Sequence, residues 1–139
     1  MRFWDSSAVL PLLVEEEASA GRKAQFAEDP RMIVWWACRI ECASALNRLR
    51  REGALDEPAL TFALRNLETL SGGWFEVQPM DDLRARAMRL LRVHPLRAAD
   101  SLQLAAALMA TVEDPSKIRL LTADSRLREA AEREGFTVE

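Results

Sequence analysis

Four acidic side chains in this sequence stand at or near the start of a predicted helix. They are Asp5, Glu41, Asp100 and Asp124. In an open parallel sheet, strand-to-helix junctions gather at the carboxyl edge of the strands, where ligands bind. Carboxylates that meet there repel one another by roughly 4 kcal/mol per pair at ~4 Å in a surface-like dielectric, and a bound divalent cation relieves that repulsion. The pattern therefore predicts a metal-dependent site.

The types of these side chains indicate which ion such a site would hold. Carboxylate oxygens without histidine or cysteine select a hard cation, Mg²⁺ or Mn²⁺. One or two such ions can bridge a phosphate oxygen, activate the attacking water and stabilise the leaving oxygen. The only histidine, His94, is distant in sequence, and Cys38 and Cys42 lie one turn apart on a predicted helix, where we interpret them as core residues. The side chains therefore predict a site for a hard cation and not for zinc.

Each acid also has a structural explanation, as a helix cap or as a favourable charge near a helix dipole. Neighbouring residues weaken that explanation. Ser6 or Ser7 can cap the helix after Asp5, and Ser125 can cap the helix after Asp124, so neither aspartate is needed as a cap. We therefore favour one shared metal site over four separate caps.

The elements that must position these acids alternate between strand and helix along the chain. Predicted strands cover residues 2–5, 32–36, 74–77 and 118–122, with an edge strand at 136–138. Predicted helices cover residues 8–16 and 19–27, a segment that carries Glu41 and ends at Gly53, a segment after Asp56, residues 80–92, residues 100–110 and a segment that opens at Asp124. This alternation predicts an α/β fold with a parallel sheet covered on both faces.

Length and composition limit the architecture. A chain of 139 residues, 49% hydrophobic and 29% charged, is expected to form a single globular domain spanning 1–139. No run of about 18 apolar residues is present, so we expect no membrane span. The first predicted strand begins at residue 2 and leaves no room for a signal peptide, so we expect a cytoplasmic protein. The net charge of −3 disfavours a protein that coats nucleic acid nonspecifically.

Four segments around the acids carry a resemblance to a known family. They read FWDSSAVLPLL, RIECASALNRL, LRAADSLQLAAAL and LLTADSRLREAAEREGF. In this order and at this spacing they resemble the four acidic motifs of PIN-domain nucleases, and the compact form resembles the VapC-like toxins of type II toxin–antitoxin systems. The resemblance runs from Arg2 to Val138. It implies a PIN-like three-layer α/β/α sandwich with a central parallel sheet of four to five strands.

The resemblance also implies roles for the acids. Asp5 and Asp100 would be the principal ligands of Mg²⁺ (or Mn²⁺), and Glu41 and Asp124 would complete the cluster, directly or through water. All four are therefore expected to be both catalytic and metal-binding. The implied activity is that of a Mg²⁺-dependent endoribonuclease, which hydrolyses RNA phosphodiester bonds as the toxin of a toxin–antitoxin pair. The choice of RNA comes from the resemblance alone.

Supporting residues lie in the same motifs. Ser7 and Thr122 match positions where the family often carries a hydroxyl that steadies the acids, and they serve equally well as helix-entry or strand-end residues. Arg97 lies three residues before Asp100 and is a candidate phosphate contact, with an exposed loop arginine as the simpler interpretation. Further candidates for contacts to an RNA backbone are Arg39, Arg48, Arg51, Arg86, Arg89 and Arg92.

The resemblance implies two protein partners, a cognate antitoxin that inserts a helix or peptide near the acidic site and a second copy of the chain in a homodimer. Two alternatives stay open. A receiver-like Mg²⁺-binding signalling domain also gathers acids at the carboxyl edge of a parallel sheet, but it usually has an acidic pair after the first strand and a lysine after the last. Here Asp5 stands alone, and the only lysines are Lys23 and Lys117. The second alternative is a catalytically silent PIN scaffold.

Overall fold

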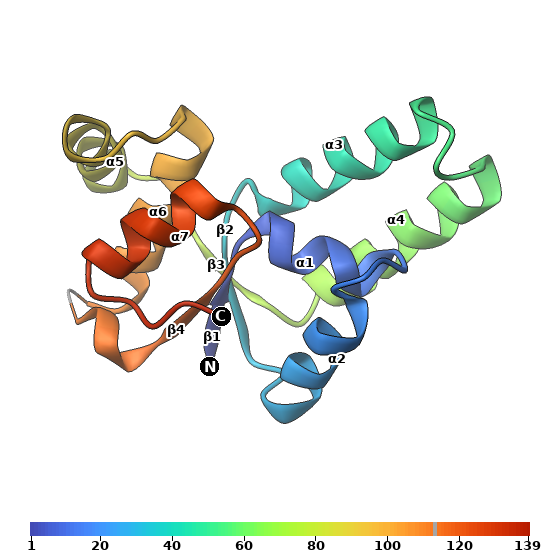
Figure 1. Ribbon diagram of the computed structural model, residues 1–139, viewed down its shortest axis with the longest axis horizontal. Helices are drawn as coiled ribbons and strands as arrows, with labels where there is room; N and C mark the ends of the chain where they lie inside the picture. The colour runs from blue at the N-terminus through green and yellow to red at the C-terminus, as the bar shows by residue number, and fades with distance from the viewer. Residues whose placement is uncertain (113) are drawn as a thin grey trace.

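A parallel sheet of four strands forms the centre of the computed structural model, which describes residues 1–112 and 114–139 (Figure 1). The strands are β1 (Arg2–Trp4), β2 (Met32–Trp35), β3 (Phe75–Val77) and β4 (Arg119–Leu121). They lie in the order β3-β2-β1-β4, and every neighbouring pair is parallel. The central strand β2 is buried along its whole length, which explains why its sequence is a continuous apolar run.

Successive side chains of β1 and β4 enter two separate hydrophobic cores. Phe3 and Leu120 belong to the core on one face of the sheet, and their chain neighbours Trp4 and Leu121 belong to the core on the other face. Because side chains alternate across a strand, a sheet covered on both faces needs apolar residues at every position. The sequence supplies them in β2 and at the ends of β1 and β4.

Helices cover both faces of the sheet. Their bounds are α1 (Ser6–Leu13), α2 (Ser19–Glu28), α3 (Cys38–Arg51), α4 (Glu57–Ser71), α5 (Asp81–Val93), α6 (Ala98–Ala110) and α7 (Ser125–Arg133), with a 3₁₀ turn at Pro115–Lys117. Figure 1 shows α1 to α4 on one side of the sheet and α5 to α7 on the other. The predicted fold class, a three-layer α/β/α sandwich with a central parallel sheet of four to five strands, is confirmed.

The strand order places a switch point beside β1. The chain runs outward from β1 to β2 and β3, and then returns through α5 and α6 to pair β4 with the other side of β1. Where the direction of winding reverses, the connections leave in opposite directions and open a crevice at the carboxyl ends of the strands. The fold therefore provides a place for a ligand beside the ends of β1 and β4.

The predicted edge strand at residues 136–138 is reduced to a single parallel bridge between Leu120 and Val138. The segment still pairs its backbone with β4, because the Leu120 amide donates to the Thr137 carbonyl at 3.0 Å and the Glu139 amide donates to the Leu120 carbonyl at 2.9 Å. The C-terminal segment thus shields the outer edge of β4 without extending the sheet by a full strand.

The start of α6 differs from the sequence prediction. The helix begins at Ala98, so Asp100 occupies its third position and does not begin the helix. From there the Asp100 carboxylate accepts the backbone N–H of Arg97 at 3.2 Å. This reach back to the residue before the helix stabilises an earlier start than the apolar pattern alone suggests.

The two cysteines are both free and fully buried, as expected for core residues. Within the described residues, no helix combines the length and the hydrophobicity that crossing a bilayer requires.

Candidate active site

The structure brings all four predicted acids to one cleft of about 560 Å³ at the carboxyl edge of the sheet. Asp5 comes from the end of β1, Glu41 from the first turn of α3, Asp100 from the first turn of α6, and Asp124 from the residue that precedes α7. The rest of the wall is formed by Ser6, Ser7, Leu10, Ile40, Ser44, Ala45, Arg48, Arg97, Ala99 and Gln103. Residues up to 119 positions apart in sequence therefore share one cavity.

Asp5 is the most deeply placed of the four acids, with 5% of its surface exposed. Its Oδ2 accepts hydrogen bonds from the Ser7 hydroxyl, from the Thr122 hydroxyl at 2.9 Å and from the Ser7 amide at 3.3 Å. Its Oδ1 receives only a long contact of 3.5 Å from the Ser6 hydroxyl. One oxygen of Asp5 is thus held by the protein, and the other keeps its capacity for a ligand.

The two hydroxyls that hold Asp5 are themselves oriented by backbone amides. The Ala123 amide donates to Ser7 Oγ at 2.8 Å, and the Asp124 amide donates to Thr122 Oγ1 at 3.0 Å. Each hydroxyl accepts from the backbone and gives its only proton to Asp5. The turn after β4 is therefore fastened to the end of β1, and this fixes the Asp5 carboxylate at the switch point.

Glu41 is half-buried and lies against Gln103, whose amide nitrogen donates to Glu41 Oε2 at 2.6 Å. Burial raises the pKa of Glu41, and the negative charges of Asp5 and Asp100 raise it further, while hydrogen bonds from Ser6 and Gln103 act in the opposite direction. The charges that act on Glu41 show that this side chain belongs to the same electrostatic cluster as the two aspartates.

The electrostatics of Asp100 indicate the same cluster. Burial raises the pKa of Asp100, and the charges of Asp124 and Asp5 add to that shift, against the opposing hydrogen bond from the Arg97 amide. Both half-buried acids therefore carry raised pKa values, with burial and neighbouring carboxylates as the causes. A site with this much uncompensated negative charge attracts a cation.

Two of the acids also act as helix caps, which corrects the sequence analysis. Asp5 caps α1 by accepting from the Ser7 amide, and Asp124 caps α7 by accepting from the Arg126 and Leu127 amides, both at 2.9 Å. The expectation that neighbouring serines make these aspartates unnecessary as caps is wrong. A cap needs extended backbone angles, and Asp5 and Asp124 have them, whereas the serines that follow are already helical.

The donor set fits a hard cation, because it consists of carboxylate oxygens that keep unused lone pairs. Asp124 uses only Oδ1 for its cap, and Asp100 uses only Oδ2 for the Arg97 amide. Among the described residues, however, no group of three or more His, Cys, Asp or Glu side chains is arranged to hold a metal ion as the side chains stand. Ion binding therefore requires the free carboxylate oxygens to turn toward one another.

Gln103 is the residue of the cleft that sequence analysis missed. It lies three positions after Asp100 on α6, and this spacing places both side chains on one face of the helix. A polar residue inside the run Leu102 to Ala107, one turn after an acid of the site, was the available indication. Of the seven arginines proposed as RNA contacts, Arg48 and Arg97 line the cleft and the other five do not.

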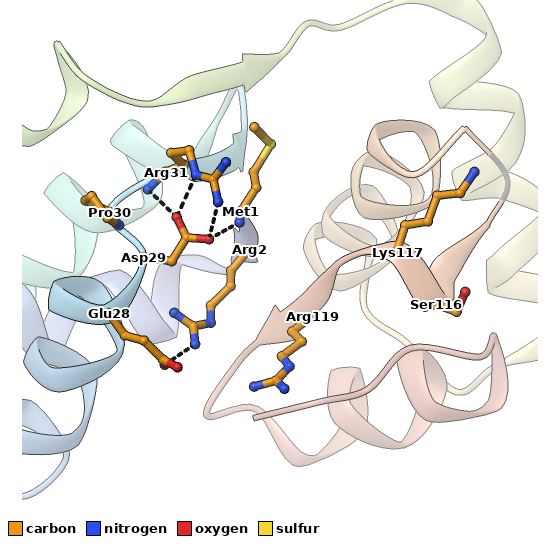
Figure 2. Close-up of a pocket in the computed structure, with 9 residues that line it drawn as sticks. All are labelled: Met1, Arg2, Glu28, Asp29, Pro30, Arg31, Ser116, Lys117 and Arg119. Carbon is orange, nitrogen blue, oxygen red and sulfur yellow. Dashed lines mark hydrogen bonds and ion pairs between the residues drawn. The ribbon is translucent and has the colours of Figure 1, made fainter.

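A second cavity, also of about 560 Å³, lies at the opposite edge of the sheet, where β1, β2 and β4 begin (Figure 2). Its charges are largely paired with one another. Asp29 accepts from Arg31 Nε at 2.8 Å and Nη2 at 3.0 Å, and it also pairs with the amino group of Met1. The Arg31 hydrogen bonds hold the pKa of Asp29 well below its usual range. Because these charges are already paired with one another, this cavity is a weaker candidate for an active site than the acidic cleft.

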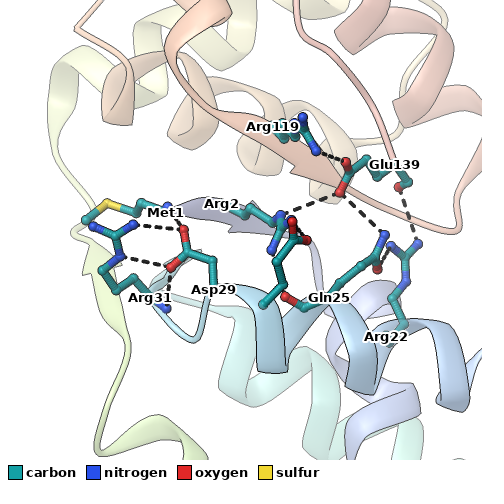
Figure 3. A network of polar contacts seen from close by, with 9 residues as sticks. Met1, Arg2, Arg22, Gln25, Asp29, Arg31, Arg119 and Glu139 are labelled. Atoms are coloured by element: carbon teal, nitrogen blue, oxygen red, sulfur yellow. Dashed lines mark hydrogen bonds and ion pairs between the residues drawn. The ribbon is translucent and has the colours of Figure 1, made fainter.

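Glu139 is the centre of a polar network beside that cavity (Figure 3). Its carboxylate pairs with Arg119 at 2.5 Å and with Arg2 at 3.5 Å, and its backbone carbonyl accepts from Arg22 at 3.3 Å. Arg22 also donates to the Thr122 carbonyl at 3.1 Å. The network joins the C-terminal segment to α2 and β1. Through Arg22 it also holds the backbone of Thr122, the residue that follows β4.

Solved structures that share this fold include a toxin–antitoxin complex from Klebsiella pneumoniae, at a TM-score of 0.65 and 13% identity over 91% of this chain and 88% of that chain. PAE2754 from Pyrobaculum aerophilum has a TM-score of 0.68 and 18% identity, covering 99% of this chain and 87% of its own. FitAcB from Neisseria gonorrhoeae has a TM-score of 0.68 and 15% identity, covering 99% and 96%. Identities this low show a common fold only. The sequence matches no protein-family model and no curated protein.

Proposed function

We propose that the chain is a Mg²⁺-dependent endoribonuclease of the PIN-domain family and the VapC-like toxin of a toxin–antitoxin pair. The observation that carries the proposal is the convergence of Asp5, Glu41, Asp100 and Asp124 from four separate segments into one cleft at the switch point of the sheet. The pKa values of Glu41 and Asp100 support it, because burial raises them and the charges of the other acids raise them further. Without a cation, the carboxylates of such a cluster repel one another and lower the stability of the fold. A bound cation attracts all of them and removes that cost.

The residues of the cleft have different roles in the proposed phosphodiester hydrolysis. A Mg²⁺ or Mn²⁺ ion supplies Lewis-acid chemistry and an activated water when it is bound. By the family resemblance, Asp5 and Asp100 are its principal ligands, with Glu41 and Asp124 completing the set. Ser7 and Thr122 hold Asp5 in place through its Oδ2, and the other Asp5 oxygen keeps its capacity for a ligand.

The cleft also offers cationic contacts for an RNA strand. Arg48 lies on α3 and Arg97 directly precedes α6, so the two arginines of the cleft come from different helices. Both are exposed, and Arg is well suited to bidentate contacts with phosphate. We assign Arg48 and Arg97 to contacts with the phosphates of the RNA strand.

The proposed toxin role includes a cognate antitoxin, a homodimer and a place in the cytoplasm. The fold shared with a Klebsiella pneumoniae toxin–antitoxin complex supports this role. An antitoxin that inserts a helix or peptide near the acids would block substrate entry to a cleft of this size, about 560 Å³.

A cleavage assay tests the enzymatic proposal. A labelled structured RNA is incubated with the purified protein and Mg²⁺, and we expect endonucleolytic products that disappear with EDTA. Asp5→Asn and Asp100→Asn should abolish cleavage. Asp81→Asn is a matched control, because Asp81 lies in the first turn of α5 outside the cleft, as Asp100 lies in the first turn of α6. Cleavage that survives EDTA and both cleft substitutions contradicts the proposal.

One observation favours the alternative of a catalytically silent scaffold, namely that Asp5 and Asp124 already serve as helix caps. Calorimetric titration with Mn²⁺ separates the two, since a silent scaffold gives no binding heat and the proposed enzyme binds. The receiver-like alternative is disfavoured because neither lysine reaches the acidic cleft. Lys117 lines the cavity at the opposite edge of the sheet (Figure 2), and Lys23 lies on α2.

A further inference from the structure

A buried glutamine in the wall of the acidic cleft has no role in the chemistry described so far. Gln103 is 2% exposed and lies in the part of α6 that packs on the sheet, directly before the fully buried residues Leu104, Ala105 and Ala106. Every other side chain from Leu102 to Ala107 is apolar. An amide at this position needs a physical reason, because buried polar groups lose their hydration and must recover it through hydrogen bonds.

The hydrogen bonds of Gln103 are made on one side only. Its Nε2 donates to Glu41 Oε2 at 2.6 Å, whereas its Oε1 is buried and has no hydrogen-bond partner among the residues that the structure describes. The orientation of the amide is fixed by its neighbour, because a carboxylate can only accept and the nitrogen must therefore face it. The unpaired Oε1 is a cost to stability, since an apolar side chain of the same shape would bury no unsatisfied oxygen of its own, and the half-buried Glu41 that loses its donor can still reach water.

The bond between Gln103 and Glu41 joins the two helix layers above the strand ends. Glu41 belongs to α3, which packs in the core on one face of the sheet, and Gln103 belongs to α6 in the core on the other face (Figure 1). Asp100 lies one turn before Gln103 on the same face of α6. The amide thus sets the position of the α3 acid relative to an acid of α6.

We propose that Gln103 is the positioning residue of the acidic cleft, whose amide holds the Glu41 carboxylate in place for a divalent cation. This assignment rests on the proposed metal-dependent function and adds to it the side chain that orients one of the four acids. Hydrogen-bond partners of metal ligands fix the orientation of the ligand, and their loss typically weakens metal affinity or activity by about 10- to 100-fold. Without the amide, Glu41 is free to turn away from Asp5 and Asp100.

Mn²⁺ affinity of the otherwise intact protein is the measurement that tests this role. Gln103→Met keeps the length of the side chain and removes both the donor and the unpaired acceptor. We expect Mn²⁺ binding, followed by calorimetry or by the loss of the free-ion EPR signal, to weaken by about 10- to 100-fold. The melting temperature without metal should stay equal or rise. Gln78→Met is the matched control, because Gln78 also donates to a glutamate, Glu76, at 3.4 Å but lies outside the cleft.

A double substitution shows whether Gln103 acts through Glu41. In a Glu41→Ala background the ligand that Gln103 orients is gone, so Gln103→Met should cause no further loss of Mn²⁺ affinity. A second loss of similar size in that background contradicts the assignment. So does an affinity within about twofold of wild type for Gln103→Met alone, or a clear fall in its metal-free melting temperature, which marks the amide as structural. If wild type binds no Mn²⁺, the proposed function and the assignment both fail, whereas the other three outcomes overturn the assignment alone.

Discussion

Replacement of Asp100 by Asn should stabilise the metal-free protein and destabilise the protein in Mg²⁺. The substitution removes one negative charge from the cluster while keeping a side-chain oxygen that can accept from the Arg97 amide. Burial raises the pKa of Asp100, and the charges of Asp124 and Asp5 raise it further, so its charge is unfavourable when no cation is present. The sign of the effect therefore depends on the ion, and a purely structural aspartate would not behave in this way.

The gain in stability of Asp100→Asn without metal can be estimated from the Coulomb energy of one pair of carboxylates. At a separation of ~8 Å and an effective dielectric of 20, one pair of carboxylates repels by about 2 kcal/mol before screening. Asp100 is partly exposed, and at ~0.1 M salt the Debye length is only about 10 Å, so roughly half of this or less survives for each pair. Two such pairs, less the attraction that Asp100 loses to Arg97, leave a net gain of about 1 kcal/mol for Asp100→Asn, or roughly 2–4 °C in melting temperature for a domain of this size.

Added Mg²⁺ should reverse the order of the two melting temperatures. At an ion concentration about 100 times its dissociation constant, binding stabilises the wild-type protein by about 2.7 kcal/mol. The variant lacks one principal ligand and should gain much less. Thermal melts in EDTA and across a Mg²⁺ series, with Asp81→Asn as control, measure both effects. A variant that melts below wild type in EDTA, and by the same margin at every Mg²⁺ concentration, refutes the reasoning.

Three further predictions concern the other residues of the cleft. In EDTA, the gain in melting temperature of Glu41→Gln over wild type should grow as pH rises from about 4 to 8. Burial raises the folded-state pKa of Glu41, so wild type loses stability as pH rises through that pKa, and a gain that shrinks with pH contradicts this. Thr122→Val removes a buried donor to Asp5 and should destabilise the protein by about 1–3 kcal/mol in denaturant titrations, and an unchanged midpoint argues against the hydroxyl network. Arg48→Ala and Arg97→Ala should each lower the slope of log affinity against log salt for single-stranded RNA by about 0.7, with Arg51→Ala unchanged, and equal slopes in all variants exclude phosphate contacts.

The positions of Asp5, Glu41 and Asp124 were predictable because they depend on simple patterns, whereas Asp100 lies at a junction between two helices, α5 and α6, that these patterns do not cover. A buried parallel strand is a continuous apolar run, and a polar residue directly after it must lie at the carboxyl edge of the sheet. The run Met32–Trp35 and the junctions at Asp5 and Asp124 follow that pattern closely. Convergence of these residues then follows from the parallel direction of the strands, which the alternation with helices already implies.

The details that sequence analysis missed depend on side-chain competition and tertiary contact. Which of several adjacent polar residues caps a helix is decided by backbone angles at the strand end, and these favour Asp5 over Ser6. The role of Gln103 was not predicted because its partner Glu41 lies 62 positions away in sequence, on a helix of the opposite layer. The edge segment near Val138 was overestimated, because its pairing with one side of β4 yields only a bridge.

A crystal soaked in Mn²⁺ and measured for anomalous scattering is the most direct test of the metal site. We expect a strong peak in the cleft between Asp5 and Asp100, with Glu41 still hydrogen-bonded to Gln103. A cleft that stays without a peak, with Asp5 and Asp124 remaining only helix caps, would contradict it.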